Sequence, residues 1–143
     1  MKILILHGPH LSLLGKVSSR TQSRLTLDKV DRHIKEIARK NELDLKIFHL
    51  FGQKNVLKTV LTNRNKVDAV IINLGGMARG FYALQEMLAI INLPVVEVTL
   101  SEFPLSKEMF EHSAIGEIAV HRIYDKGLVA YEKALNYLIT KNK

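Results

Sequence analysis

The sequence has 143 residues, no cysteine, no tryptophan and only three prolines. Without cysteine, the fold cannot depend on disulfides and thiolate metal sites are excluded. Apolar runs stay well short of the about eighteen residues that a membrane-spanning helix needs. The first run, which begins at Ile3, is too short for the core of a signal peptide and is typical of a strand. We therefore expect one cytoplasmic domain over residues 1–143 that folds around a hydrophobic core.

Acidic residues are scarce relative to basic ones, with 14 against 21, which gives a formal charge of +7. This surplus would attract polyanions, so nucleic acid is a candidate partner. The basic residues are spread along the chain, however, and aromatic residues suited to stacking on bases are not interleaved with them. We expect a solvated basic surface that favours small anionic ligands, and nucleic-acid binding stays as an alternative.

Apolar segments of strand length alternate along the chain with segments of helical periodicity. The predicted strands are Lys2–His7, Leu43–Phe48, Ala69–Asn73, Pro94–Val98 and Ile118–His121. The first predicted helix begins after an N-cap at Thr26. The later predicted helical segments are Val56–Leu61, Phe81–Leu88, a short turn at Lys107–Phe110, and Lys126–Thr140. Right-handed crossovers between such units predict an α/β fold, a flavodoxin-like three-layer sandwich whose parallel sheet has the order 2-1-3-4-5.

This topology also predicts where a ligand binds. In open α/β sheets, ligands bind beyond the carboxyl ends of the strands, where the strand order reverses. Three segments leave the predicted strands at that edge: Gly8–Ser12, Asn73–Arg79 and Thr99–Glu102. Each carries polar groups, so we expect the three to form one binding site.

The same three segments carry a family resemblance. The first, residues 7–15, reads HGPHLSLLG and is similar to N-G-P-N-L-N-x-L-G. The second, residues 71–84, reads IINLGGMARGFYAL and is similar to I-I-N-P-G-A-x-T-H-T-S-x-A-L. The third, residues 94–102, reads PVVEVTLSE and is similar to P-x-I-E-V-H-L-S-N. In this order, and over the whole chain, they resemble the type II 3-dehydroquinate dehydratases, which implies the same flavodoxin-like fold.

The resemblance implies a chemistry whose main groups are replaced in this chain. Enzymes of that family take a proton from beside a ketone with a tyrosine that an arginine makes more acidic, and a histidine protonates the departing hydroxyl. The matching positions are Gln22, Val17 and Thr99. Neither an amide nor an alkyl group can act as the base, and a hydroxyl does not supply a proton as imidazolium does. A loop asparagine corresponds to His10, and a substrate-orienting histidine corresponds to Arg79.

The groups that the resemblance assigns to carboxylate binding are kept. Asn73, Leu100 and Ser101 match residues that hold the substrate carboxylate through backbone N–H groups, an amide and a hydroxyl, and such hydrogen bonds are charge-assisted. Gly75 would let a ligand approach the backbone closely. Arg79 would add a positive charge to the rim. We therefore expect a pocket for a small anionic carboxylate.

The resemblance also implies an assembly of trimers arranged into a twelve-subunit shell. Glu86 stands where the family has an aspartate that reaches a neighbouring subunit's site. The helix around it offers more apolar surface than one sheet face needs, through Phe81, Tyr82, Leu84, Met87 and Leu88. We expect a homo-oligomer, at least a trimer, with the dodecamer as an open alternative.

Three functions follow from these residues. The first is a divergent dehydroquinase-like pseudoenzyme that binds a carboxylate but has lost the dehydration machinery. The second is an active 3-dehydroquinate dehydratase of the shikimate pathway, or a related lyase, that uses His10 for proton transfer. The third is a basic nucleic-acid-binding protein. No cofactor or metal is expected, because His7 and His10 have too few further ligands nearby in the sequence.

Overall fold

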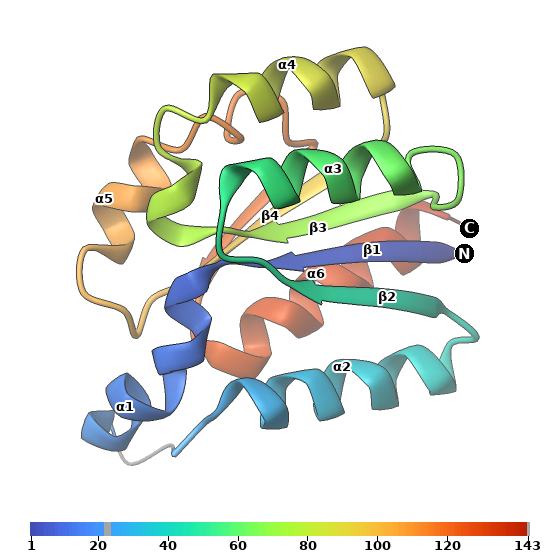
Figure 1. The fold of residues 1–143 in the computed structure, drawn as a ribbon. Coiled ribbons are helices and arrows are strands. Elements are labelled where there is room, and N and C mark those ends of the chain that lie inside the picture. Colours follow the sequence, from blue (N-terminus) through green and yellow to red (C-terminus); the bar gives the residue numbers. More distant parts are fainter. Residues whose placement is uncertain (22–23, 143) are drawn as a thin grey trace.

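The computed structural model describes residues 1–21 and 24–142 and shows a parallel sheet between two layers of helices (Figure 1). The sheet has the order β2-β1-β3-β4-β5 and every neighbouring pair is parallel. Its strands are β1 (Lys2–His7), β2 (Asp44–His49), β3 (Ala69–Asn73), β4 (Val95–Leu100) and β5 (His121–Asp125). The predicted flavodoxin-like sandwich and its strand order are confirmed.

Helices cover both faces of this sheet (Figure 1). One face carries α2 (Leu27–Lys40) and α6 (Gly127–Lys141), and the other carries α3 (Gln53–Asn63), α4 (Tyr82–Ile91) and α5 (Ser106–Glu111). Short helical segments follow two of the strands. After β1 come η1 (Pro9–Leu13), α1 (Leu14–Ser18) and η2 (Ser19–Thr21), and after β3 comes η3 (Gly75–Ala78). None of the helices in the described part of the chain is long and apolar enough to cross a membrane.

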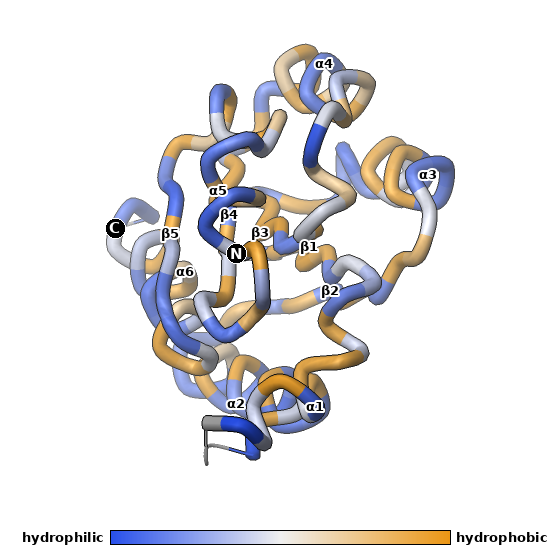
Figure 2. The backbone as a smooth tube through the Cα atoms, turned by 90° about the vertical axis from the view of Figure 1, so that its left-hand side faces the viewer, coloured by the Kyte–Doolittle hydropathy of each residue, from blue (hydrophilic) through white to orange (hydrophobic). Residues whose placement is uncertain are grey.

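The central strands are mainly apolar because both of their faces are buried. On β1, Ile3 and Ile5 pack toward α2 and α6, whereas Leu4 and Leu6 pack toward α3 and α4. Figure 2 shows hydrophobic colour along the strands and alternating colours around the helices, as expected for helices with one buried side. This double burial explains why both alternating sets of side chains on β1 are apolar.

The start of α2 follows directly from its sequence. Thr26 has an extended backbone, and its hydroxyl accepts a hydrogen bond from the backbone N–H of Lys29 at 3.3 Å. This bond satisfies one of the amide groups that the first helical turn leaves unpaired. The predicted N-cap is confirmed.

The predicted position of the last strand is wrong. The strand begins at His121 and not at Ile118, because residues 115–119 form a turn in which the Ile115 carbonyl accepts hydrogen bonds from the backbone N–H groups of Ile118 and Ala119. Both side chains pack against the α3–α4 side of the core from this turn. Ile118 and Ala119 are apolar because they pack against the core from a turn, and not because they belong to a strand.

The predicted apolar surface of α4 also needs correction. Phe81, Leu84 and Leu88 are buried in the core of this chain and are not available to a partner. The exposed large apolar side chains of this helix are Tyr82 and Ile90, which are 69% and 77% exposed. The helical period places these two residues on the side that faces away from the sheet.

Candidate active site

The carboxyl ends of β1, β3 and β4 meet around a pocket of about 80 Å³. Its walls come from η1, from η3, and from the end of β4 with the loop into α5. The lining residues are His10, Gly75, Gly76, Thr99, Leu100, Phe103, Pro104, Ser106 and Met109. The three strand exits that the sequence pointed to thus contribute to one pocket.

The loops approach so closely that one position requires glycine. The backbone N–H of Gly8 donates to the Asn73 carbonyl at 2.8 Å. A Cβ added at Gly8 would lie 2.5 Å from the Leu74 carbonyl oxygen. Only a residue without a side chain allows this backbone contact, which holds η1 against η3 and closes one side of the pocket.

His10 is the titratable side chain in the wall of the pocket. Its ring packs edge-on against Phe103 with the ring centroids 4.7 Å apart, and its Nε2 lies 3.1 Å from Asn73 Oδ1. Its Nδ1 is buried and has no hydrogen-bond partner among the described residues. Burial lowers the pKa of His10 to about 4, against the opposing effect of the Asn73 hydrogen bond. At neutral pH the imidazole is therefore uncharged and can accept a proton or a hydrogen bond.

Asn73 lies beneath the pocket and not in its lining. The side chain is 1% exposed. Its Oδ1 faces His10, and its Nδ2 donates to the Tyr131 hydroxyl at 3.0 Å. Because the side chain is buried beneath the pocket, it acts on a ligand through His10 and not by direct contact.

The end of β4 contributes the other predicted groups. Thr99 and Leu100 line the pocket, as does Gly75 opposite them. The backbone N–H of Ser101 donates to the Asp125 carbonyl at 2.9 Å. Because that donor is already used, the hydroxyl is the group of Ser101 that remains for an anion.

The other predicted residues lie outside this lining. Arg79 is exposed, and its Nη1 lies 4.0 Å from Glu108 Oε1. Glu86 is exposed on α4. Val17 packs partly buried against the α2–α6 side of the core. Gln22 lies outside the residues that the structure describes.

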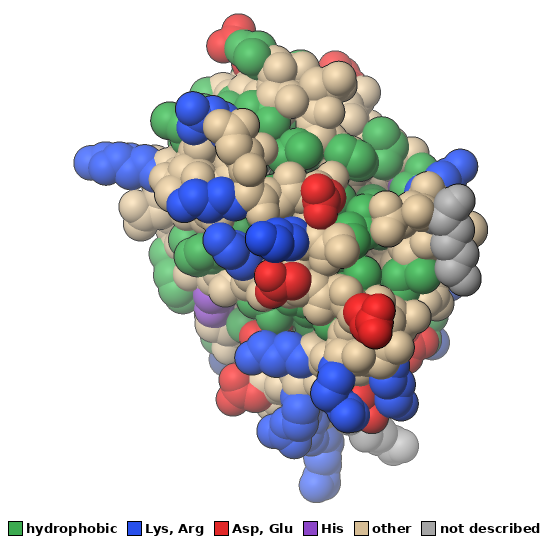
Figure 3. All heavy atoms as spheres, turned by 90° about the vertical axis from the view of Figure 1, so that its right-hand side faces the viewer, with side chains coloured by type: hydrophobic (Ala, Val, Ile, Leu, Met, Phe, Trp, Pro, Cys, Tyr) green, Lys and Arg blue, Asp and Glu red, His purple; other side chains and the backbone are tan. Residues whose placement is uncertain are grey.

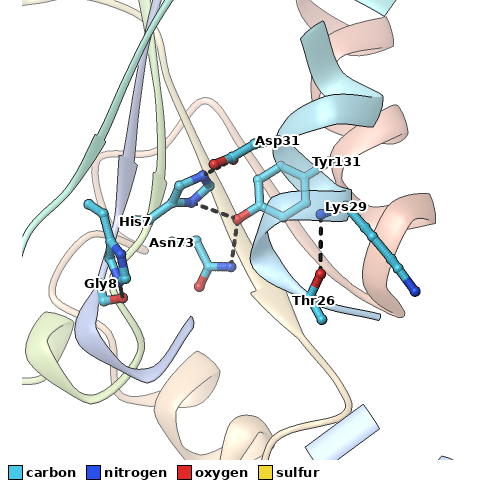
Figure 4. A network of polar contacts seen from close by, with 8 residues as sticks. His7, Gly8, Thr26, Lys29, Asp31, Asn73 and Tyr131 are labelled. Atoms are coloured by element: carbon cyan, nitrogen blue, oxygen red, sulfur yellow. Dashed lines mark hydrogen bonds and ion pairs between the residues drawn. The ribbon is translucent and has the colours of Figure 1, made fainter. Parts of the chain in front are cut away.

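A buried polar group next to the pocket was not anticipated from the sequence. His7 is fully buried; its Nε2 lies 2.9 Å from Asp31 Oδ1 and its Nδ1 lies 3.1 Å from the Tyr131 hydroxyl (Figure 4). Burial raises the pKa of Tyr131, so its hydroxyl keeps its proton. The only sequence signal was a tyrosine among the apolar positions of the last helix, whose hydroxyl needs a partner when buried.

Nowhere in residues 1–21 and 24–142 do three histidine, aspartate or glutamate side chains gather as metal ligands. His7 and His10 bond to different groups, Asp31 and Asn73.

Comparison with known proteins settles the family. The family model described as dehydroquinase class II matches residues 1–139. The chain belongs to this dehydroquinase family. A relative named 3-dehydroquinate dehydratase in Histophilus somni is 30% identical over 136 residues, covering 95% of this chain and 91% of the relative. Another of the same name in Polynucleobacter necessarius is 31% identical and covers 99% and 95% of the two chains.

A solved structure agrees with this membership. The type II dehydroquinase from Propionibacterium acnes superposes with a TM-score of 0.83 at 25% identity, covering 97% of this chain and 96% of the other. The resemblance that the three loop segments carry is therefore confirmed at the level of family and fold.

Proposed function

We propose that this dehydroquinase-family chain is a lyase that removes water from 3-dehydroquinate or a closely related cyclic hydroxy-acid, without a cofactor. The observation that carries the proposal is the uncharged His10 in the pocket wall, whose buried Nδ1 has its lone pair free of partners among the described residues. The relatives named 3-dehydroquinate dehydratase give the substrate class.

The dehydration needs one group that first takes and then returns a proton. His10 Nδ1 would remove the proton from the carbon beside the ketone, which gives an enolate and an imidazolium. The C–O bond on the adjacent carbon then breaks, and the imidazolium returns its proton to the departing oxygen, so that water leaves. The Thr99 hydroxyl, in the same pocket, would orient the departing group without supplying the proton.

The low pKa of His10 predicts slow turnover. A base is most effective when its pKa lies near the working pH, because a weaker base has less driving force for removing a proton. Burial holds the pKa of His10 at about 4, well below that optimum. We expect measurable but poor dehydration.

The substrate carboxylate would lie toward the rim. A pocket of about 80 Å³ is small compared with ordinary ligand sites of roughly 300–1,000 Å³, so it takes only part of such a molecule. The Ser101 hydroxyl, the Leu100 backbone and the charge of Arg79 would hold the carboxylate, and charge-assisted hydrogen bonds favour that arrangement.

The test is ultraviolet absorbance of the conjugated product formed from 3-dehydroquinate. We expect slow conversion by the wild type and a loss of about a hundredfold or more in His10→Asn, the usual contribution of a general base. His33→Asn, which changes a histidine bonded to Glu132, is the matched control and should keep the rate. An unchanged rate in His10→Asn contradicts the role of His10.

A second candidate is binding of the same ligand without turnover, as a pseudoenzyme. It is favoured by Thr99 and Val17, which stand where the family resemblance places the acid and the arginine. This candidate predicts no conversion of 3-dehydroquinate but a rise in melting temperature when 3-dehydroquinate is added, since ligands that bind the folded state stabilise it. Absence of both signals contradicts both candidates.

We further propose a cytoplasmic homo-oligomer, a trimer or a dodecamer, that buries the exposed Tyr82 and Ile90 of α4 beside Glu86.

Nucleic-acid binding is the weakest candidate. Figure 3 shows Lys and Arg side chains interleaved with Asp and Glu on the face around the two termini, which argues against a continuous basic track there.

A further inference from the structure

A line of hydrogen bonds connects the pocket with the opposite helix layer. It begins at Asp31 on α2 and passes through His7 on β1, Tyr131 on α6 and Asn73 on β3 to His10 on η1. The successive distances are 2.9, 3.1, 3.0 and 3.1 Å. Figure 4 shows the first four side chains pointing toward one another. His7 and Tyr131 are 0% exposed and Asn73 is 1% exposed, so water does not compete for these bonds.

The donors and acceptors along this line can be assigned from its outer end. The Asp31 carboxylate can only accept, so His7 Nε2 carries a hydrogen. The Tyr131 hydroxyl has one hydrogen, which it donates to His7 Nδ1. That hydroxyl in turn accepts from Asn73 Nδ2, which turns Asn73 Oδ1 toward the pocket.

The last bond determines the tautomer of His10. Because Asn73 presents an oxygen, His10 Nε2 must donate to it. An uncharged imidazole has one N–H, and that hydrogen is now placed on Nε2. The lone pair therefore remains on Nδ1, next to Gly75, where an added Cβ would lie 2.7 Å from Nδ1. This nitrogen is buried against the Gly75 backbone, so a ligand meets its lone pair when the η3 turn at Gly75 moves aside.

We propose that Asp31 is a positioning residue for the pocket: through His7, Tyr131 and Asn73 it holds His10 in the Nε2–H tautomer, with Nδ1 as a hydrogen-bond acceptor toward the ligand. The amide of Asn73 transmits an orientation and not a proton. The arrangement selects a ligand that presents a hydroxyl or another donor to Nδ1. Any effect on dehydration rests on the proposed function, whereas the tautomer itself does not.

The substitution Asp31→Asn separates this role from ordinary structural support. Asparagine has nearly the same shape, and its amide can either accept from His7 or donate to it. In the reversed arrangement every bond is still made, but each donor becomes an acceptor, the Asn73 amide turns over, and His10 carries its hydrogen on Nδ1. We therefore expect a folded variant in which His10 populates both tautomers.

Two further variants complete the experiment. Tyr131→Phe removes the middle of the line and leaves Asn73 free to turn, so it should also give both tautomers. Glu132→Gln is the matched control, since Glu132 Oε1 accepts from His33 at 2.7 Å in a pair outside this line. It should leave His10 unchanged.

The measurement is the two-bond ¹H–¹⁵N correlation spectrum of the ¹⁵N-histidine-labelled protein at neutral pH without any ligand. His10→Asn identifies the His10 signals. We expect one Nε2–H pattern in the wild type and in Glu132→Gln, and mixed or averaged patterns in Asp31→Asn and Tyr131→Phe. A wild-type His10 already protonated on Nδ1 overturns the proposal, as does a pure Nε2–H pattern in Asp31→Asn or, should that variant not fold, in Tyr131→Phe.

The dehydration assay then tests the consequence for the reaction. If His10 is the base, Asp31→Asn should lower the rate in proportion to the lost Nε2–H fraction, about twofold for equal populations. Inactive wild-type protein with the expected spectra would contradict the proposed function alone. Active wild-type protein with unchanged spectra in the variants would contradict this inference alone.

Discussion

His10 and His33 show how strongly the surroundings of a side chain decide its chemistry. His33 lies near the surface and bonds to a carboxylate, Glu132. His10 lies against Phe103 and bonds to an uncharged amide, so burial without a charged partner holds its pKa at about 4. His10 is thus an uncharged hydrogen-bond acceptor at the pocket, whereas a histidine in water has a pKa near 6.5.

This buried histidine should make folding sensitive to acid. Unfolded His10 would take up a proton near pH 6.5, whereas the folded protein resists protonation until about pH 4. The unfolded state therefore binds more protons below pH 6.5, and stability falls as the pH drops through this window, by about 2–3 kcal/mol from this one group. Urea unfolding at pH 7.5 and pH 4.5 measures the loss.

The variant His10→Asn should reduce that pH dependence, because asparagine does not titrate. The exposed His112→Asn provides the control. Equal losses of stability between the two pH values in the wild type and in His10→Asn would show that His10 is not responsible.

At the scale of elements, the pocket depends on how closely two short helical turns approach. Gly8 lies in backbone contact with Leu74, and this contact places η1 against η3. The sequence showed glycine and proline after the first strand, but it could not show which of them faces another backbone.

The substitution Gly8→Ala should therefore be costly. Its Cβ would lie 2.5 Å from the Leu74 carbonyl oxygen, so the two turns must separate. We expect a loss of about 1–3 kcal/mol in the free energy of unfolding, the usual cost of overpacking, measured by urea denaturation. In Gly52→Ala the new Cβ meets nothing within 4 Å, so this control should lose little. Similar stabilities of the two variants would contradict the close-approach argument.

Sequence patterns predicted the elements best where burial and period agree. The bounds of β1 and β3 were predicted to the residue, because continuous apolar runs are typical of strands that are covered on both sides. Ile118 misled the placement of the last strand because it packs from a turn. The line from Asp31 to His10 was not predictable, since its bonds join residues that only the tertiary fold brings together.

At the scale of the whole molecule, one side of α4 carries two large apolar side chains that this chain does not cover. Tyr82 and Ile90 are the most exposed residues of their kind among the described residues. Large exposed apolar groups of this sort commonly mark an interface.

The double substitution Tyr82→Glu with Ile90→Glu should reduce the assembled mass, because burying two new charges at an interface is unfavourable. Light scattering coupled to gel filtration measures it. Val129→Glu, on the exposed side of α6, is the control and should leave the mass unchanged. A wild-type mass of 16.2 kDa, that of a single chain, would contradict the proposed oligomer.

The position of β1 also has a consequence for folding kinetics. This strand comes first in the chain, yet it lies inside the sheet, where Lys2 pairs with Asp44 and Ile3 pairs with Ala69. During synthesis its apolar residues must wait, unpaired, until β2 and then β3 have emerged. Parallel pairings between segments distant in the sequence form slowly, and the apolar segments stay exposed to aggregation until they pair. The nascent chain is therefore most prone to aggregate before residue 73 is available to pair with β1.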